Sequence, residues 1–257
     1  MKITDIKKAS KNPCWEFKAA AKGIGELYIY GEIVSDKWDD TDTTAASFKK
    51  DLDALGDIKT LNIFINSPGG SVFQGQTIYS ILMRVTAYKN AYVDGLAASI
   101  ASLIPMAADK VFMPMNATMM IHNPWTFTMG NAEELRKDAD TLDKISVGML
   151  AAYMAKIKDK TSEEKLKELL DDETWLSAQD AFDYGFVDEL IEEKQIAACC
   201  DKEIFAAYKN VPENLRSMLA EGDKHLSEAE RQVIIDETRK SSEERKKYLE
   251  VRKNDFV

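Results

Sequence analysis

The chain has 257 residues and a formal net charge of −10, with 34 lysines and arginines against 44 aspartates and glutamates. This acidic balance argues against binding to nucleic acid or to an anionic membrane surface, because both would repel the protein. The three cysteines, Cys14, Cys199 and Cys200, lack metal-ligand spacing, so we expect reduced thiols and no metal site.

Strand and helix patterns alternate along the chain. Residues 27–33 predict a strand, and a helix is expected from a cap at Asp42 and Thr43 to Gly56. Residues 61–66 predict a buried strand, followed by a tight loop over 67–71. Further along we expect helices over 72–85, 97–107, 131–158 and 162–170, a short helix ending at 184–185, strands over 91–93, 110–113 and 117–121, and a closing segment over 186–188. The alternation predicts an α/β fold with repeated β-β-α units.

The last part of the chain has a different charge pattern. Residues 223–257 hold nine basic and nine acidic residues, so residues 1–222 carry the whole net charge. Pairs such as Glu243 and Lys247 lie at helical spacing. We therefore expect one domain over 1–195 and a charged extension over 196–257, helical or partly disordered, with a partner-binding helix as the alternative.

Targeting signals are not evident in the sequence. Residues 1–6 run into polar sequence without an apolar segment, which predicts no signal peptide. The apolar run over 100–108 is too short to span a bilayer. We expect a cytoplasmic protein that does not bind a membrane.

Ser99 is the candidate nucleophile. It lies among the small residues Gly95, Ala97, Ala98 and Ala101, where a strand is expected to turn into a helix. Unpaired backbone N–H groups at a helix start favour a developing oxyanion, but a serine hydroxyl also needs an adjacent base. A serine that caps a buried helix is the common alternative, and Ser99 does not lie in a G-x-S-x-G motif.

His122 is the candidate base, and it is one of only two histidines, with His225. It ends an apolar run and precedes a proline-bearing loop, a usual place for a catalytic side chain. A histidine bonded to backbone is the alternative. The carboxylate that would orient its ring is one of Asp171, Asp172 and Glu173, and the residues alone do not choose among them.

Four motifs in this order resemble ClpP, the proteolytic subunit of the Clp protease, over roughly residues 25–192. The closest similarity is to the ClpP-like proteases of phages and prophages, called head maturation proteases. The motifs are Ile65-Asn66-Ser67-Pro68-Gly69-Gly70, Gly95-Leu96-Ala97-Ala98-Ser99, Met120-Ile121-His122-Asn123-Pro124, and Leu176-Ser177-Ala178 with Tyr184-Gly185-Phe186-Val187-Asp188. The resemblance implies a ClpP/crotonase-like β-β-α superhelix with a long oligomerisation helix over about 131–158.

The resemblance also implies a role for each site residue. Ser99 would be the nucleophile and His122 the general base and then acid. Glu173 would be the acidic member, where the family usually has Asp, with Asp172 as the fallback. The oxyanion donors would be the N–H groups of Gly69 and Ile100. A bound peptide would be flanked by Gly70, Ser71 and Val72 and by Pro124, Trp125 and Thr126. No cofactor or metal is implied.

The function implied is that of a serine endopeptidase acting through an acyl-enzyme, in a homo-oligomeric ring of seven subunits or in stacked rings. The N-terminal segment lacks an obvious counterpart of the axial loop that docks an ATPase ring, which argues against an ATPase partner. In a phage setting, the extension would bind capsid or scaffold protein. The alternative is a catalytically weak or inactive ClpP-fold assembly protein, motivated by Glu173 and the extension. A crotonase-type enzyme acting on acyl-CoA thioesters shares the fold but needs no serine nucleophile.

Overall fold

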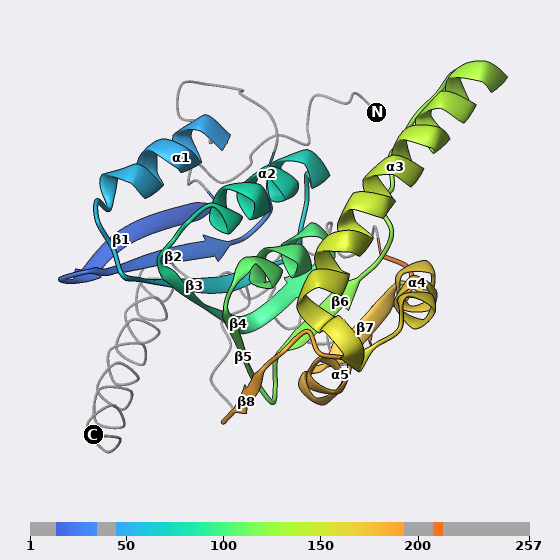
Figure 1. Cartoon of the computed structure of the whole chain (residues 1–257). Coiled ribbons are helices and arrows are strands. Elements are labelled where there is room, and N and C mark those ends of the chain that lie inside the picture. The colour runs from blue at the N-terminus through green and yellow to red at the C-terminus, as the bar shows by residue number, and fades with distance from the viewer. Residues whose placement is uncertain (1–13, 35–44, 193–207, 213–257) are drawn as a thin grey trace, which may run out of the picture. The chain divides into compact units, whose positions relative to one another are not determined.

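One eight-stranded sheet organises the part of the chain that the computed structural model describes, residues 14–34, 45–192 and 208–212 (Figure 1). The chain divides into two compact units, Met1–Pro212 and Glu213–Val257, and the second lies outside the described residues. The strands are β1 (Trp15–Ala21), β2 (Ile24–Tyr30), β3 (Thr60–Ser67), β4 (Tyr88–Ala98), β5 (Lys110–Pro114), β6 (Thr118–Ile121), β7 (Thr174–Ser177) and β8 (Glu189–Ile191). The helices are α1 (Ala45–Ala54), α2 (Val72–Met83), the 3₁₀ helix η2 (Ser99–Ala107), α3 (Ala132–Ile157), the 3₁₀ turn η3 (Lys158–Lys160), α4 (Glu163–Asp171) and α5 (Ala178–Asp183).

Strand β4 is the centre of the sheet because it is shared between two neighbours. The strand order is β1-β2-β3-β4-β5-β8, and every pair from β2 to β8 is parallel. The first part of β4 pairs with β5, whereas its last residues, 96–98, pair with β6. β6 in turn pairs antiparallel with β7. The predicted α/β alternation is thereby confirmed.

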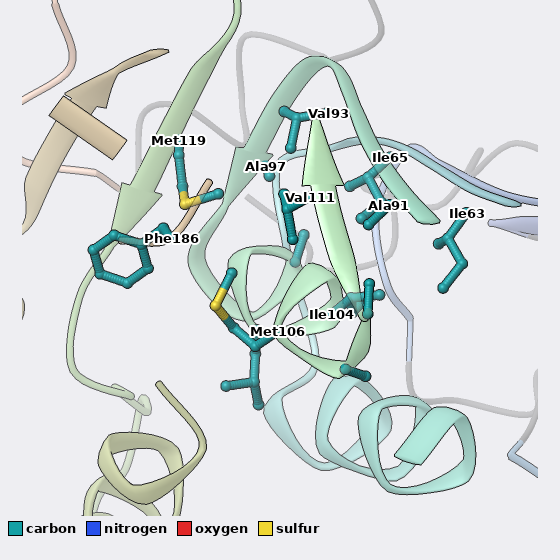
Figure 2. Close-up of a cluster of buried hydrophobic side chains, with 14 of the residues drawn as sticks. Ile63, Ile65, Ala91, Val93, Ala97, Ile104, Met106, Val111, Met119 and Phe186 are labelled. Atoms are coloured by element: carbon teal, nitrogen blue, oxygen red, sulfur yellow. The ribbon is translucent and has the colours of Figure 1, made fainter. Parts of the chain in front are cut away.

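Side chains alternate between the two faces of the sheet, as the period of a β-strand requires. Ile63 and Ile65 of β3 enter the main core together with Ala91 and Val93 of β4, and this core also takes in residues of η2 (Figure 2). The residues between them face the other way and form a stack of aromatic rings. That stack consists of Tyr28, Phe64, Tyr92 and Phe112, with neighbouring centroids 4.8 to 5.2 Å apart.

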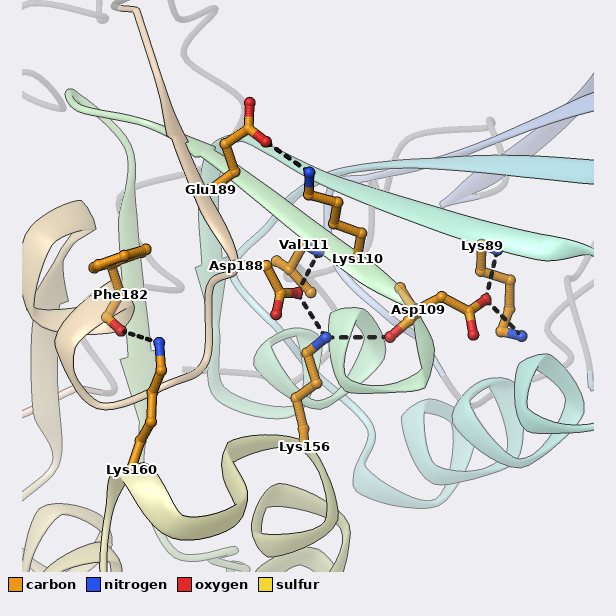
Figure 3. A network of polar contacts seen from close by, with 10 residues as sticks. Lys89, Asp109, Lys110, Val111, Lys156, Lys160, Phe182, Asp188 and Glu189 are labelled. Carbon is orange, nitrogen blue, oxygen red and sulfur yellow. Dashed lines mark hydrogen bonds and ion pairs between the residues drawn. The ribbon is translucent and has the colours of Figure 1, made fainter. Parts of the chain in front are cut away.

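A network of charged side chains ties the end of the sheet to α3 (Figure 3). Asp188 accepts hydrogen bonds from the Val111 N–H at 2.8 Å and from Lys156 Nζ at 2.7 Å. Lys110 pairs with Glu189 across β5 and β8 at 2.7 Å. These contacts hold β8 against β5 and pair the charges that they involve. We therefore interpret the network as structural support.

Helix α3 has a capped start and a mostly exposed body. The Asn131 side chain accepts from the Glu133 and Glu134 N–H groups in a capping box. Only Met149, Tyr153 and Ile157 of this 26-residue helix are buried, and all three lie in its second half. Figure 1 shows the first turns extending away from the sheet. The predicted long helix over 131–158 is confirmed.

Several predicted boundaries were wrong for identifiable reasons. The strand expected over 91–93 is part of the eleven-residue β4, and the helix expected from 97 begins at 99, because 96–98 pair with β6. The strand expected over 27–33 ends at Tyr30, where Gly31 turns the chain with a φ of 87°. The segment expected to close the series over 186–188 is followed by one more strand, β8, at 189–191. β1 was missed, and the cap expected at 42–43 lies outside the described residues.

Candidate active site

Strand register brings the predicted nucleophile and base together. Ala98 of β4 is paired with Met120 of the parallel strand β6, so the carboxyl ends of the two strands lie side by side. Ser99 follows one strand directly and His122 follows the other. Ser99 Oγ lies 2.7 Å from His122 Nε2, and each residue is only 7% exposed. An imidazole at this distance is placed to take the proton of the hydroxyl.

The backbone of Ser99 forms a sharp turn between β4 and η2. Its φ is 54°, a left-handed conformation that costs a non-glycine residue on the order of 1–2 kcal/mol. Ser102 Oγ donates to the Ser99 carbonyl oxygen at 2.5 Å and lies 2.7 Å from the Tyr153 hydroxyl on α3. Burial raises the pKa of Tyr153, so its phenol stays protonated and available as a donor. The turn is therefore supported from beneath by hydrogen bonds.

The loop after β3 lies against the nucleophile. Gly69 has a φ of 99°, and a Cβ atom there would lie 2.7 Å from both the Ala98 carbonyl oxygen and Ser99 Cβ. Only glycine fits this position. The Gly69 N–H donates to Ser67 Oγ at 3.2 Å, and the loop is held on its other side by Ile33, whose N–H donates to the Gly69 carbonyl oxygen at 2.7 Å.

Glu173 is the carboxylate that the structure places beside the base. Ile121 of β6 is paired with Thr174 of the antiparallel strand β7. His122, which follows Ile121, therefore lies beside Glu173, which precedes Thr174. Glu173 Oε2 lies 3.9 Å from His122 Nδ1, and the Glu173 residue is 8% exposed. Asp172 is exposed at the end of α4, where its backbone carbonyl oxygen accepts from Asn210 Nδ2. Glu173 also adopts a left-handed φ of 51°.

Burial controls the proton affinity of the candidate base. It lowers the pKa of His122 below its ordinary value. The negative charge of Glu173 opposes this shift, whereas the positive charge of Lys209 adds to it. The imidazole is thus neutral at neutral pH and able to accept a proton.

The two segments predicted to hold a peptide differ in how exposed they are. Gly70 is exposed and bridges to Ile33 in parallel, while Ser71 and Val72 are half-buried at the start of α2. On the other flank Pro124 is buried, and Trp125 and Thr126 are exposed. Ile100 is buried in the first turn of η2. Of the predicted site residues, the structure brings Gly69 and Glu173 close to Ser99 and His122 respectively, and the roles of the flanking residues stay predictions.

Residues 208–210 also contact the site, and sequence reasoning did not find them. The Lys209 and Asn210 N–H groups donate to Glu173 Oε1 at 2.6 and 2.9 Å. Tyr208 donates its hydroxyl to the Pro68 carbonyl oxygen at 2.6 Å and packs its ring edge-on to His122. These residues fall in the segment assigned to the charged extension.

Buried Cys14 provides no competing nucleophile. Desolvation raises its pKa to about 11, so the thiol stays protonated and unreactive. The other two cysteines lie outside the described residues. Within the described part of the chain, no helix has the length and apolar character needed to cross a bilayer.

The sequence is similar to that of known proteins. A model of the Clp protease family matches residues 32–194. The chain is 32% identical over 156 residues to the ATP-dependent Clp protease proteolytic subunit of Streptococcus agalactiae serotype V (strain ATCC BAA-611 / 2603 V/R), covering 56% of this chain and 75% of that protein. It is 34% identical over 151 residues to the protein of the same name from Streptococcus pneumoniae (strain Hungary19A-6), covering 54% of this chain and 72% of that protein.

Proposed function

The chain belongs to the Clp protease family, and from this premise we propose that it is a serine endopeptidase acting through an acyl-enzyme intermediate. The observation that carries the proposal is the 2.7 Å contact between Ser99 Oγ and His122 Nε2 in a buried site. A serine hydroxyl is a weak nucleophile at neutral pH unless a base of this kind adjoins it.

Acylation would follow from this geometry. His122 Nε2 takes the Ser99 proton as Oγ attacks the peptide carbonyl carbon, forming a C–O bond and placing negative charge on the carbonyl oxygen. His122 then gives the proton to the leaving amine, and the C–N bond breaks. Glu173 would stabilise the charged imidazole between these two steps. Water attacks the ester in the second half, with His122 again taking and returning the proton.

The oxyanion donors we propose are the N–H groups of Gly69 and Ile100. The close approach of Gly69 to Ser99 and the position of Ile100 in the first turn of η2 support this assignment. Each such donor contributes on the order of 10²–10³ in rate in other serine proteases. The Gly69 N–H would exchange its long hydrogen bond to Ser67 Oγ for one to the oxyanion.

The proposal also covers substrates, location and oligomeric state. We propose protein or peptide substrates, a cytoplasmic location and a homo-oligomer, whether a heptameric ring or stacked rings. The exposed first half of α3 supports an oligomer, as do Phe127 and Met129, which are 95% and 96% exposed just before it. A role in phage head maturation, with capsid or scaffold protein bound by the extension, is the most specific version of this proposal.

The second candidate is an assembly protein of the same fold without turnover. The 3.9 Å distance between Glu173 and His122 favours it, because that distance is longer than a hydrogen bond. Apo sites are often loose in this way and tighten when substrate binds. We therefore place it second.

Hydrolysis of unstructured substrate tests the proposal directly. The purified full chain should cleave a fluorogenic peptide and denatured casein without ATP, because no residue of the proposed mechanism uses a nucleotide. Mass spectrometry of the products should show internal cuts. A chain that forms its native oligomer, cleaves neither substrate and does not react with a fluorophosphonate would support the assembly protein instead.

The pH dependence of labelling should report the state of His122. The rate of fluorophosphonate reaction, measured from about pH 4.5 to 8.5, should rise as His122 loses its proton and then level off. Since burial lowers the pKa of His122, the midpoint should fall below the ordinary histidine value. Glu173→Gln removes the negative charge that opposes this shift, so its midpoint should fall further. A midpoint above the ordinary value would contradict the assignment of His122 as the base.

A further inference from the structure

We propose that residues 208–212, here called the clamp segment, position the catalytic acid: their backbone N–H groups hold one oxygen of Glu173 so that the other faces His122. This inference rests on the proposed function, because it needs Glu173 to act as the catalytic acid. Sixteen residues separate β8 from the clamp segment, which contacts Glu173, the proposed catalytic acid.

The carboxylate of Glu173 is divided between two partners. Oε1 accepts the Lys209 N–H at 2.6 Å and the Asn210 N–H at 2.9 Å, whereas Oε2 lies 3.9 Å from His122 Nδ1. The Glu173 side chain is 10% exposed, so water has little access to take the place of these donors. Two short bonds to one oxygen fix the plane of the carboxylate and direct its other oxygen towards the imidazole.

The need for such a clamp follows from the identity of the acid. Glutamate has one more rotatable bond than the aspartate usual in this family. Fixing this longer side chain costs more rotamer entropy than fixing that of aspartate. Donors supplied by the backbone of the clamp segment offset that cost without requiring a charged partner. The left-handed φ of Glu173 also shows that its backbone is held in an unusual conformation.

The clamp segment is anchored at several points around the site. Asn210 Nδ2 donates to the Asp172 carbonyl oxygen at 2.8 Å, and the Tyr208 hydroxyl donates to the Pro68 carbonyl oxygen at 2.6 Å. The Tyr208 ring packs edge-on to His122 and to Trp175, with centroids 5.6 and 6.0 Å away. The clamp segment as a whole therefore contacts the loop before Gly69, the base and the acid. The relative position of these three parts sets the rate.

A proline substitution tests the donor itself. Lys209→Pro removes the N–H that donates to Glu173, whereas Lys209→Ala removes the same charged side chain but keeps that N–H. In the full chain, we expect kcat for a fluorogenic peptide to be roughly tenfold lower in Lys209→Pro than in Lys209→Ala, with KM changed less than about twofold. Thermal unfolding of both variants would show whether the fold persists.

A double-mutant cycle distinguishes positioning from general disturbance. On a Glu173→Ala background the clamp segment has no carboxylate to hold, so Lys209→Pro should then reduce kcat by less than about twofold relative to Lys209→Ala. Equal losses on both backgrounds would overturn the proposal. Higher activity or faster fluorophosphonate labelling in Lys209→Pro would overturn it too and identify the segment as an inhibitor. A wild-type chain that never reacts would instead refute the proposed function.

Asn210→Pro provides a second variant in case Lys209→Pro does not fold. It removes the other donor to Glu173, and its matched control, Asn210→Ala, loses only the side-chain bond to Asp172. The same ordering of kcat, with the proline variant below the alanine variant, is expected. Equal kcat values in this pair would contradict the clamp.

Discussion

Ser99→Ala should abolish covalent labelling by a fluorophosphonate and should lower peptide hydrolysis by at least roughly 10⁴-fold, given losses near 10⁶-fold for the nucleophile of another serine protease. The reason is that Oγ is the only atom removed, and it is the atom that lies 2.7 Å from His122 Nε2. Acyl transfer then has no nucleophile held beside the base. Residual turnover would come from water attack assisted by the remaining site.

The variant should otherwise keep the native structure. Alanine and serine meet the same cost at a φ of 54°, and the bond that Ser102 donates goes to the backbone carbonyl oxygen of residue 99, which alanine retains. The melting temperature should therefore change little. Ser80→Ala, at an exposed position of α2, is the matched control and should be labelled as fast as the wild type. If Ser99→Ala were labelled at the wild-type rate, another residue would be the nucleophile.

Local sequence predicted the parts of the site that lie at strand ends. The apolar runs before Ser99 and His122 indicated two strands, and parallel pairing of those strands is enough to bring the two side chains together. The tight loop over 67–71 was predicted, and in it the structure shows a φ and a close contact at Gly69 that require glycine. Such features depend on a few neighbouring residues, so they can be read from the chain.

Other parts depend on contacts between distant segments. The length of β4 was underestimated because Ala97 and Ala98 have little strand preference of their own and become strand through pairing with β6. Among three adjacent carboxylates, the register of β6 with β7 selects Glu173, and no local pattern encodes that register. The contacts of Lys209 and Asn210 with Glu173 span more than thirty residues, so nothing near either position could have announced them.

His122→Ala should cause a loss comparable to that of Ser99→Ala, again at least roughly 10⁴-fold, because nucleophile and base act as one unit and their losses do not add. The expected pH profile is equally diagnostic. Wild-type labelling should level off once His122 is neutral, whereas in the variant the rate should keep rising with pH, since only hydroxide or water remains to take the Ser99 proton. Both rates can be measured at each pH by quenching the labelling reaction at set times and reading the labelled protein by gel fluorescence.

The order of the losses tests the assignment of roles. Glu173→Ala should lose less activity than His122→Ala, because an acid that only orients and stabilises the imidazole contributes less than the group that moves the proton; in another serine protease the acid contributes about 3 × 10⁴-fold. His122→Gln serves as the control for volume, since it fills most of the space beside Tyr208 and should be as inactive as the alanine variant. If His122→Gln retained activity while Glu173→Ala did not, the imidazole would not be the base, and the assignment of His122 would be wrong.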